Sequence, residues 1–116
     1  MSENEDQLNE LETSVLRKLA VHNPELEGII EDLKVSKRTY SGVGGFTDFE
    51  PIENDIGLGN ETLGLNDYII MIPSVPNGMG SVLFCTDGKP EMLEFFTYGS
   101  DEWYGKDMNF TLKLNT

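Results

Sequence analysis

The stretch that decides the fold is SVLFCTDGKPEMLEFFTY, residues 81–98. Asp87-Gly88 lies between two strand-like runs, and Asp-Gly is a preferred type I′ turn for a two-residue hairpin loop. The pattern therefore predicts an antiparallel hairpin over residues 81–97. Its register pairs Thr86 with Lys89, Phe84 with Glu91, and Val82 with Leu93.

This register divides the hairpin into two faces, both partly apolar. One face is predicted to carry Val82, Phe84, Leu93 and Phe95. The other is predicted to carry Leu83, Cys85, Met92 and Phe96. We therefore expect the hairpin to be central in its sheet, with helices covering the first face. Glu94 is the acid that we expect to be partly buried, first as a member of a structural ion pair and second as a site residue.

The N-terminal third has helical periodicity in two parts. Ser2 and Glu5 have capping-box spacing, and apolar residues at Leu8, Leu11, Val15 and Leu19 predict a helix over 2–21. Asn23-Pro24 is a break and a restart. A second helix is predicted from the spacing of Leu26, Ile29, Ile30 and Leu33.

After Lys34 the sequence becomes rich in glycine, aromatic and β-branched residues. Strands are predicted over 35–40, 46–52, 68–72 and 108–114, with an irregular loop over 53–66. We expect a single domain, residues 1–116, in which 1–34 are helical and 35–116 mostly β. The predicted class is α+β, with two N-terminal helices packed on a mainly antiparallel sheet.

The formal net charge is −13 on 116 residues. This charge argues against binding to nucleic acid or to an anionic membrane surface, and it favours a basic partner. No apolar run approaches the length of a membrane span, and the acidic N-terminal stretch differs from a signal peptide. A lone cysteine, Cys85, excludes an internal disulfide. We expect a cytoplasmic location.

Catalytic residue types are scarce. His22 is the only histidine and falls at a predicted helix end, while Cys85 falls inside a predicted strand. A Cys–His pair would need His22, for which we expect a capping or surface role. No His/Cys cluster exists for zinc, and the acids do not match a calcium loop. The sequence predicts no enzyme, no cofactor and no metal.

Residues 1–16 and 39–88 contain acids but no lysine or arginine, and two groups of side chains are candidates for partner binding. The first is a glycine-bounded loop that contains Tyr98, Asp101, Glu102, Trp103 and Tyr104. Trp103 either anchors a partner or folds back to cap the core, and a fully packed Trp103 favours a ligand-binding domain instead. The second group holds Asp48, Glu50, Glu53 and Asp55, which form either a solvated loop or part of a binding face.

Three segments carry a resemblance: YSGVGGFT at 40–47, GSVLFCTDG at 80–88, and MLEFFTY at 92–98 followed by Trp103. They resemble a loose set of small, acidic, largely uncharacterised bacterial proteins, some of which look like immunity proteins encoded beside polymorphic or contact-dependent toxins. The resemblance implies a shared sheet and brings no catalytic residues. The leading hypothesis is a non-enzymatic cytoplasmic inhibitor that occludes a basic toxin. The alternative is an α+β domain that binds a small ligand between sheet and helices.

Overall fold

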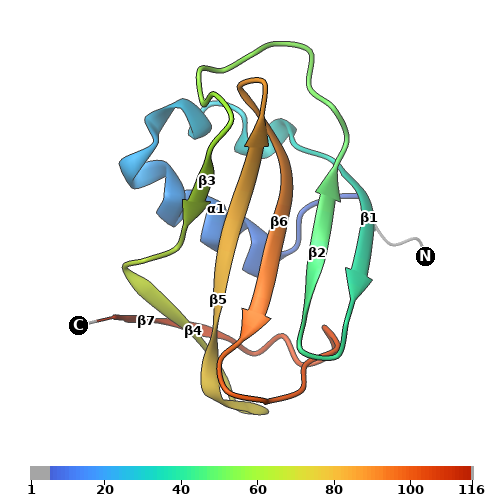
Figure 1. The fold of residues 1–116 in the computed structure, drawn as a ribbon, viewed down its shortest axis with the longest axis vertical. Coiled ribbons are helices and arrows are strands. Elements are labelled where there is room, and N and C mark those ends of the chain that lie inside the picture. Colours follow the sequence, from blue (N-terminus) through green and yellow to red (C-terminus); the bar gives the residue numbers. More distant parts are fainter. Residues whose placement is uncertain (1–5, 116) are drawn as a thin grey trace.

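A computed structural model describes residues 6–115 of the chain (Figure 1). It is an α+β fold with one helix, α1 (Glu10–His22), and a sheet of seven strands. Two short 3-10 turns follow the helix, η1 (Pro24–Leu26) and η2 (Ile30–Asp32). The strands are β1 (Val35–Tyr40), β2 (Gly44–Phe49), β3 (Thr62–Gly64), β4 (Tyr68–Ile72), β5 (Val75–Thr86), β6 (Lys89–Thr97) and β7 (Thr111–Leu114).

The strands are antiparallel and follow the order β1-β2-β6-β5-β4-β7, while β3 also pairs with β5. β5 is 12 residues long, so one edge of it accommodates two partners, β4 near its start and β3 near its end. The β5–β6 pair lies at the middle of the sheet, between β2 and β4. The predicted central hairpin is therefore confirmed.

The predicted register of that hairpin is correct only at the turn. Thr86 lies opposite Lys89, but the register then shifts, and Phe84 lies opposite Met92 rather than Glu91. Glu91 is the extra residue of a β-bulge, and a shift of one residue exchanges the faces of every later pair on that strand. Consequently Leu83 and Cys85 are buried on the helix side, whereas Val82 and Phe84 lie on the opposite face.

The prediction of two N-terminal helices is wrong in its second half. α1 begins after Asn9, whose side chain accepts from the Glu12 backbone while the Glu12 carboxylate accepts from the Asn9 N–H, a complete capping box. The Ser2–Glu5 box lies outside the described residues. Residues 24–33 form η1 and η2 instead of a helix, because Gly28 interrupts a segment too short to be helical without tertiary support. The two turns still bury Leu26, Ile30 and Leu33.

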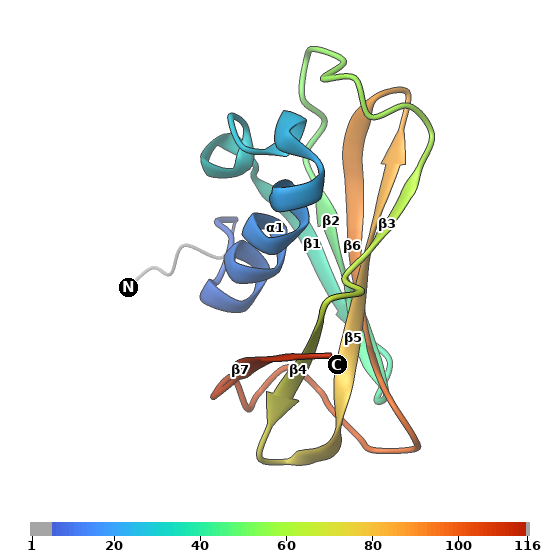
Figure 2. The same cartoon turned by 90° about the vertical axis from the view of Figure 1, so that its left-hand side faces the viewer.

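The helix and both turns lie on one side of the sheet, and the core fills the space between (Figure 2). Within residues 6–115 no helix lies on the other side of the sheet. The Cα dimensions of 40 × 38 × 19 Å agree with this two-layer arrangement.

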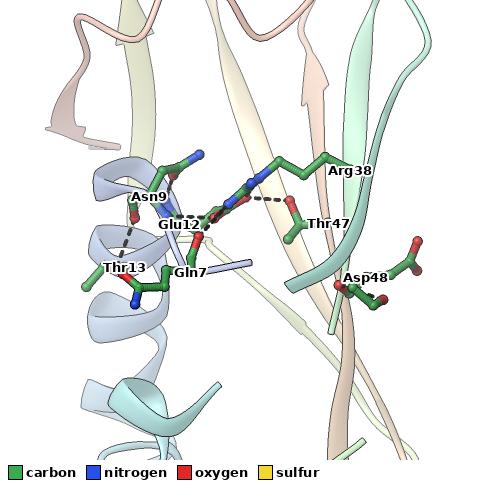
Figure 3. A network of polar contacts seen from close by, with 8 residues as sticks. Gln7, Asn9, Glu12, Thr13, Arg38, Thr47 and Asp48 are labelled. Atoms are coloured by element: carbon green, nitrogen blue, oxygen red, sulfur yellow. Dashed lines mark hydrogen bonds and ion pairs between the residues drawn. The ribbon is translucent and has the colours of Figure 1, made fainter. Parts of the chain in front are cut away.

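A buried ion pair joins the two layers (Figure 3). The Glu12 side chain is 2% exposed and accepts hydrogen bonds from Arg38 Nε at 2.8 Å and Nη2 at 2.7 Å. The Thr47 hydroxyl donates to the same carboxylate at 2.6 Å, and Arg38 also donates to the Gln7 carbonyl at 2.9 Å. Glu12, on α1, is thereby bonded to β1 and β2. The most buried acid is Glu12. Glu94 is partly buried, as predicted, but its carboxylate has no ion pair with a described residue.

Burial dictates the chemistry of the only thiol. Cys85 is 5% exposed, and desolvation, with a smaller contribution from Glu61, raises its pKa to about 11. We expect no reaction with Ellman's reagent at pH 8 in the native state and complete reaction in urea. Because the folded pKa lies above the unfolded value of about 8.5, the free energy of unfolding should fall as pH rises from there toward 11. Rapid native labelling would contradict the packing.

Candidate functional site

Trp103 fixes the loop that connects β6 to β7. Its side chain is 3% exposed and packs against the rings of Tyr40, at 5.6 Å and 82°, and Phe95, at 6.0 Å and 58°. Its backbone N–H donates to the Gly42 carbonyl at 2.9 Å, and its indole N–H donates to the Asp107 carbonyl at 3.1 Å. Of the two predicted roles, the structure therefore shows the core cap and not an exposed anchor.

The start of this loop is held by further backbone contacts. Thr97 donates from its N–H to the Val43 carbonyl at 3.0 Å and from its hydroxyl to the Asp101 carbonyl at 2.7 Å. The Asp101 carboxylate accepts from the Asn77 backbone N–H at 2.9 Å. Asp101 is thus engaged within the chain, whereas Glu102 is exposed and makes no hydrogen bond or ion pair with a described residue.

Exposed apolar side chains gather around Trp103. Among residues 6–115, six large apolar side chains are exposed, and four of them belong to β1, the β1–β2 turn or the loop after β6. These four are Tyr40 at 39%, Val43 at 51%, Tyr98 at 40% and Tyr104 at 53%. Together with Glu102 they form what we call the aromatic end of the sheet.

Glycines allow the rings at the aromatic end to approach the backbone. Gly105 has φ +81°, and a side chain there would collide with the Tyr40 ring. Gly42 has φ +96° and lies directly beneath the Tyr104 ring. Desolvation raises the pKa of Tyr40, against the lowering effect of Arg38, so its hydroxyl remains a hydrogen-bond donor at neutral pH.

The second predicted acidic group is not part of the aromatic end. Asp48 is at the far end of β2 from the β1–β2 turn, and Glu50, Glu53 and Asp55 follow in the loop at the top of Figure 1. Asp55 accepts from the Gly57 N–H at 2.6 Å and lies against Gly88, so it shapes its own loop over the hairpin turn. The structure therefore does not bring the two predicted groups of partner-binding residues into one face.

A His–Asp pair that the sequence did not indicate lies at the other edge of the sheet. His22 Nε2 is 2.7 Å from Asp67 Oδ2, and both side chains are exposed. They border an open cleft of about 380 Å³ between the end of α1 and β3, which Asn23 and Thr62 also line. The two residues are 45 positions apart, so only the fold brings them together.

Among the described residues, no group of three or more His, Cys, Asp or Glu side chains is placed to hold a metal ion. No helix in that part of the chain is both long and apolar enough to cross a membrane. Comparison of the chain with models of protein families, with curated proteins and with solved structures gives no match.

Proposed function

We propose that this chain is a non-enzymatic protein-binding domain, an immunity-type inhibitor that occludes a basic toxin. The observation that carries the proposal is the aromatic end. There, four of the six large apolar side chains that are exposed among residues 6–115 accompany the Glu102 carboxylate, which is paired with no residue of that range. Exposed tyrosines next to a carboxylate suit a protein surface that carries lysine or arginine.

Charge and aromatic contact act on different steps of binding, the first on the rate of association and the second on the rate of dissociation. The net charge of −13 attracts a basic partner and accelerates encounter, while Glu102 orients it. Tyr98 and Tyr104 then supply contact area that excludes water and slows dissociation. Because Trp103 and its hydrogen bonds fix the loop beforehand, little conformational entropy is lost on binding.

The burial of Trp103 also strengthens the alternative, an α+β domain that binds a small ligand. The cleft beside His22 and Asp67 is the feature that favours it. The two functions differ in their dependence on the histidine. Under our proposal a folded His22→Ala variant retains full biological function, whereas under the alternative it loses ligand binding.

The test uses the product of the gene directly upstream, co-expressed with this chain in a bacterial host. We expect that product to be basic and toxic, and the chain to relieve the toxicity. Tyr104→Ala should raise the Kd about 30-fold, equivalent to about 2 kcal/mol, through faster dissociation. Glu102→Lys should slow association, and added salt should reduce the difference from the wild type.

Matched controls separate the aromatic end from overall charge and apolarity. Glu53→Lys changes the net charge by the same two units at the opposite end of the sheet, and Val21→Ala truncates an apolar side chain that is 73% exposed on α1. Both variants should bind like the wild type. Equal effects of Glu53→Lys and Glu102→Lys, or an upstream product that does not bind, would refute the proposal.

A further inference from the structure

The sheet face opposite α1 is apolar along its middle. This face is turned away from α1 in Figure 2, and the strand registers place side chains from β2, β6 and β5 side by side on it. Five of them are large, apolar and partly exposed: Phe46, Val82, Phe84, Met92 and Phe96. An antiparallel sheet that faces only water carries polar residues at such positions. We call these five side chains and Glu94 the outer strip.

Glu94 occupies the centre of the outer strip. In register, Phe46 of β2 lies opposite it on one side and Val82 of β5 on the other. Its carboxylate forms no hydrogen bond or ion pair with any residue from 6 to 115. Only its backbone is engaged, in the sheet and by the Ser81 hydroxyl, which donates to its carbonyl at 2.7 Å. By contrast, Asp48 on the same face lies opposite Lys37 of β1. A partner surface that complements a lone carboxylate between apolar side chains is itself apolar and carries one cationic side chain.

The dimensions of the outer strip fit one helix. Three neighbouring strands span about 10 Å, close to the diameter of about 10–12 Å of a helix with its side chains. Polar or small residues flank the strip, with Lys37 and Thr39 on β1 and Thr62 and Gly64 on β3. From Met92 to Phe96 the strip runs about 13 Å, the length of about 9 helical residues.

The net charge of the chain and the Glu94 carboxylate indicate which kind of protein supplies this helix. A second copy of the chain would bring another net charge of −13, and a two-fold axis across the strip would place Glu94 near its own copy. We therefore propose that the outer strip binds one amphipathic helix of a basic partner, with a Lys or Arg in its apolar face paired to Glu94. The strip adjoins the aromatic end, where the Tyr98 ring packs on Phe96 at 5.6 Å between ring centroids, but it is a different surface and stands or fails independently of the proposed function.

Two synthetic helical peptides of identical composition and net charge test the proposal. In the first, a leucine stripe carries one lysine at its centre. In the second, that lysine exchanges places with a residue of the polar face. We expect the first peptide to bind more tightly, and to shift amide resonances of the 15N-labelled protein in β2, β6 and β5 rather than in α1. Glu94→Gln should weaken binding of the first peptide about tenfold and leave the affinity for the second nearly unchanged.

Glu53→Gln is the matched control, because it removes the same charge away from the strip. Equal weakening by Glu53→Gln and Glu94→Gln would overturn the proposal, as would resonance shifts confined to residues 98–105. Concentration-dependent dimerisation in sedimentation, abolished by Glu94→Arg, would identify a second copy as the occupant and would also overturn it. The resonance map on the wild-type protein remains decisive if a variant folds poorly.

Discussion

Replacing Arg38 with methionine is expected to destabilise the protein by about 3–5 kcal/mol. The substitution leaves the Glu12 carboxylate 2% exposed and without its two charged hydrogen bonds, and the Thr47 hydroxyl and the Asn9 N–H, which still donate to it, cannot compensate for the lost hydration. Urea unfolding followed by circular dichroism measures the loss as a lower midpoint with an unchanged slope.

Two further variants make the cause of this loss specific. The double variant Glu12→Met/Arg38→Met removes both charges, and it should recover most of the lost stability because no buried charge remains. Arg17→Met breaks ion pairs that are 46% exposed on the arginine side and longer, at 3.5 and 3.7 Å, and should cost less than about 1 kcal/mol. A double variant as unstable as Arg38→Met would show that packing, not charge, explains the effect.

Trp103→Ala is expected to cost about 3–5 kcal/mol, the range for a buried aromatic truncated to alanine. The side chain packs on Tyr40 and Phe95, and its removal leaves a cavity beneath the loop. Because Trp103 is the only tryptophan, unfolding should be followed by circular dichroism and not by indole fluorescence. The variant should also be cleaved faster by protease between residues 98 and 108, since the loop loses its attachment to β1 and β2.

Trp103→Phe keeps an aromatic ring but loses the hydrogen bond to Asp107, so it should be less destabilised than the alanine variant. Tyr104→Ala alters a side chain that is 53% exposed, and it should change stability by less than about 0.5 kcal/mol. If both alanine variants had the same small effect, Trp103 would not be the residue that fixes the loop.

The central hairpin could be predicted because its turn is encoded in two adjacent residues. The bulge in it could not be read from the alternation of apolar and polar residues, since both faces are partly apolar. A signal was present in Pro90, because proline lacks the N–H of a regular ladder and within strands is confined to edges, first residues and bulges. Similarly, Ser2–Glu5 and Asn9–Glu12 have the same capping-box spacing, and spacing alone does not choose between them.

Only the part of the candidate site that is contiguous in the sequence could be predicted. The loop with Tyr98, Glu102 and Tyr104 was identified from its composition, whereas the burial of Trp103 depends on Gly42 and Tyr40, far away in the sequence. The separation of the two predicted groups of partner-binding residues follows from the sheet order, which composition does not contain. The Glu12–Arg38 pair spans 26 positions and was missed for the same reason.

The strand order β1-β2-β6-β5-β4-β7 also governs when the protein folds. β2 has no second neighbour until β6 is available, so α1 has no complete sheet to pack on during most of synthesis. The end of β6 follows the end of α1 by about 75 residues, which a ribosome adds in about 4–15 s at about 5–20 residues per second. The apolar stripe of α1 remains unburied during this interval. The pairing of β2 with β6 joins segments that are distant in the sequence, and non-local pairing of this kind places the folding of such domains in the millisecond-to-second range.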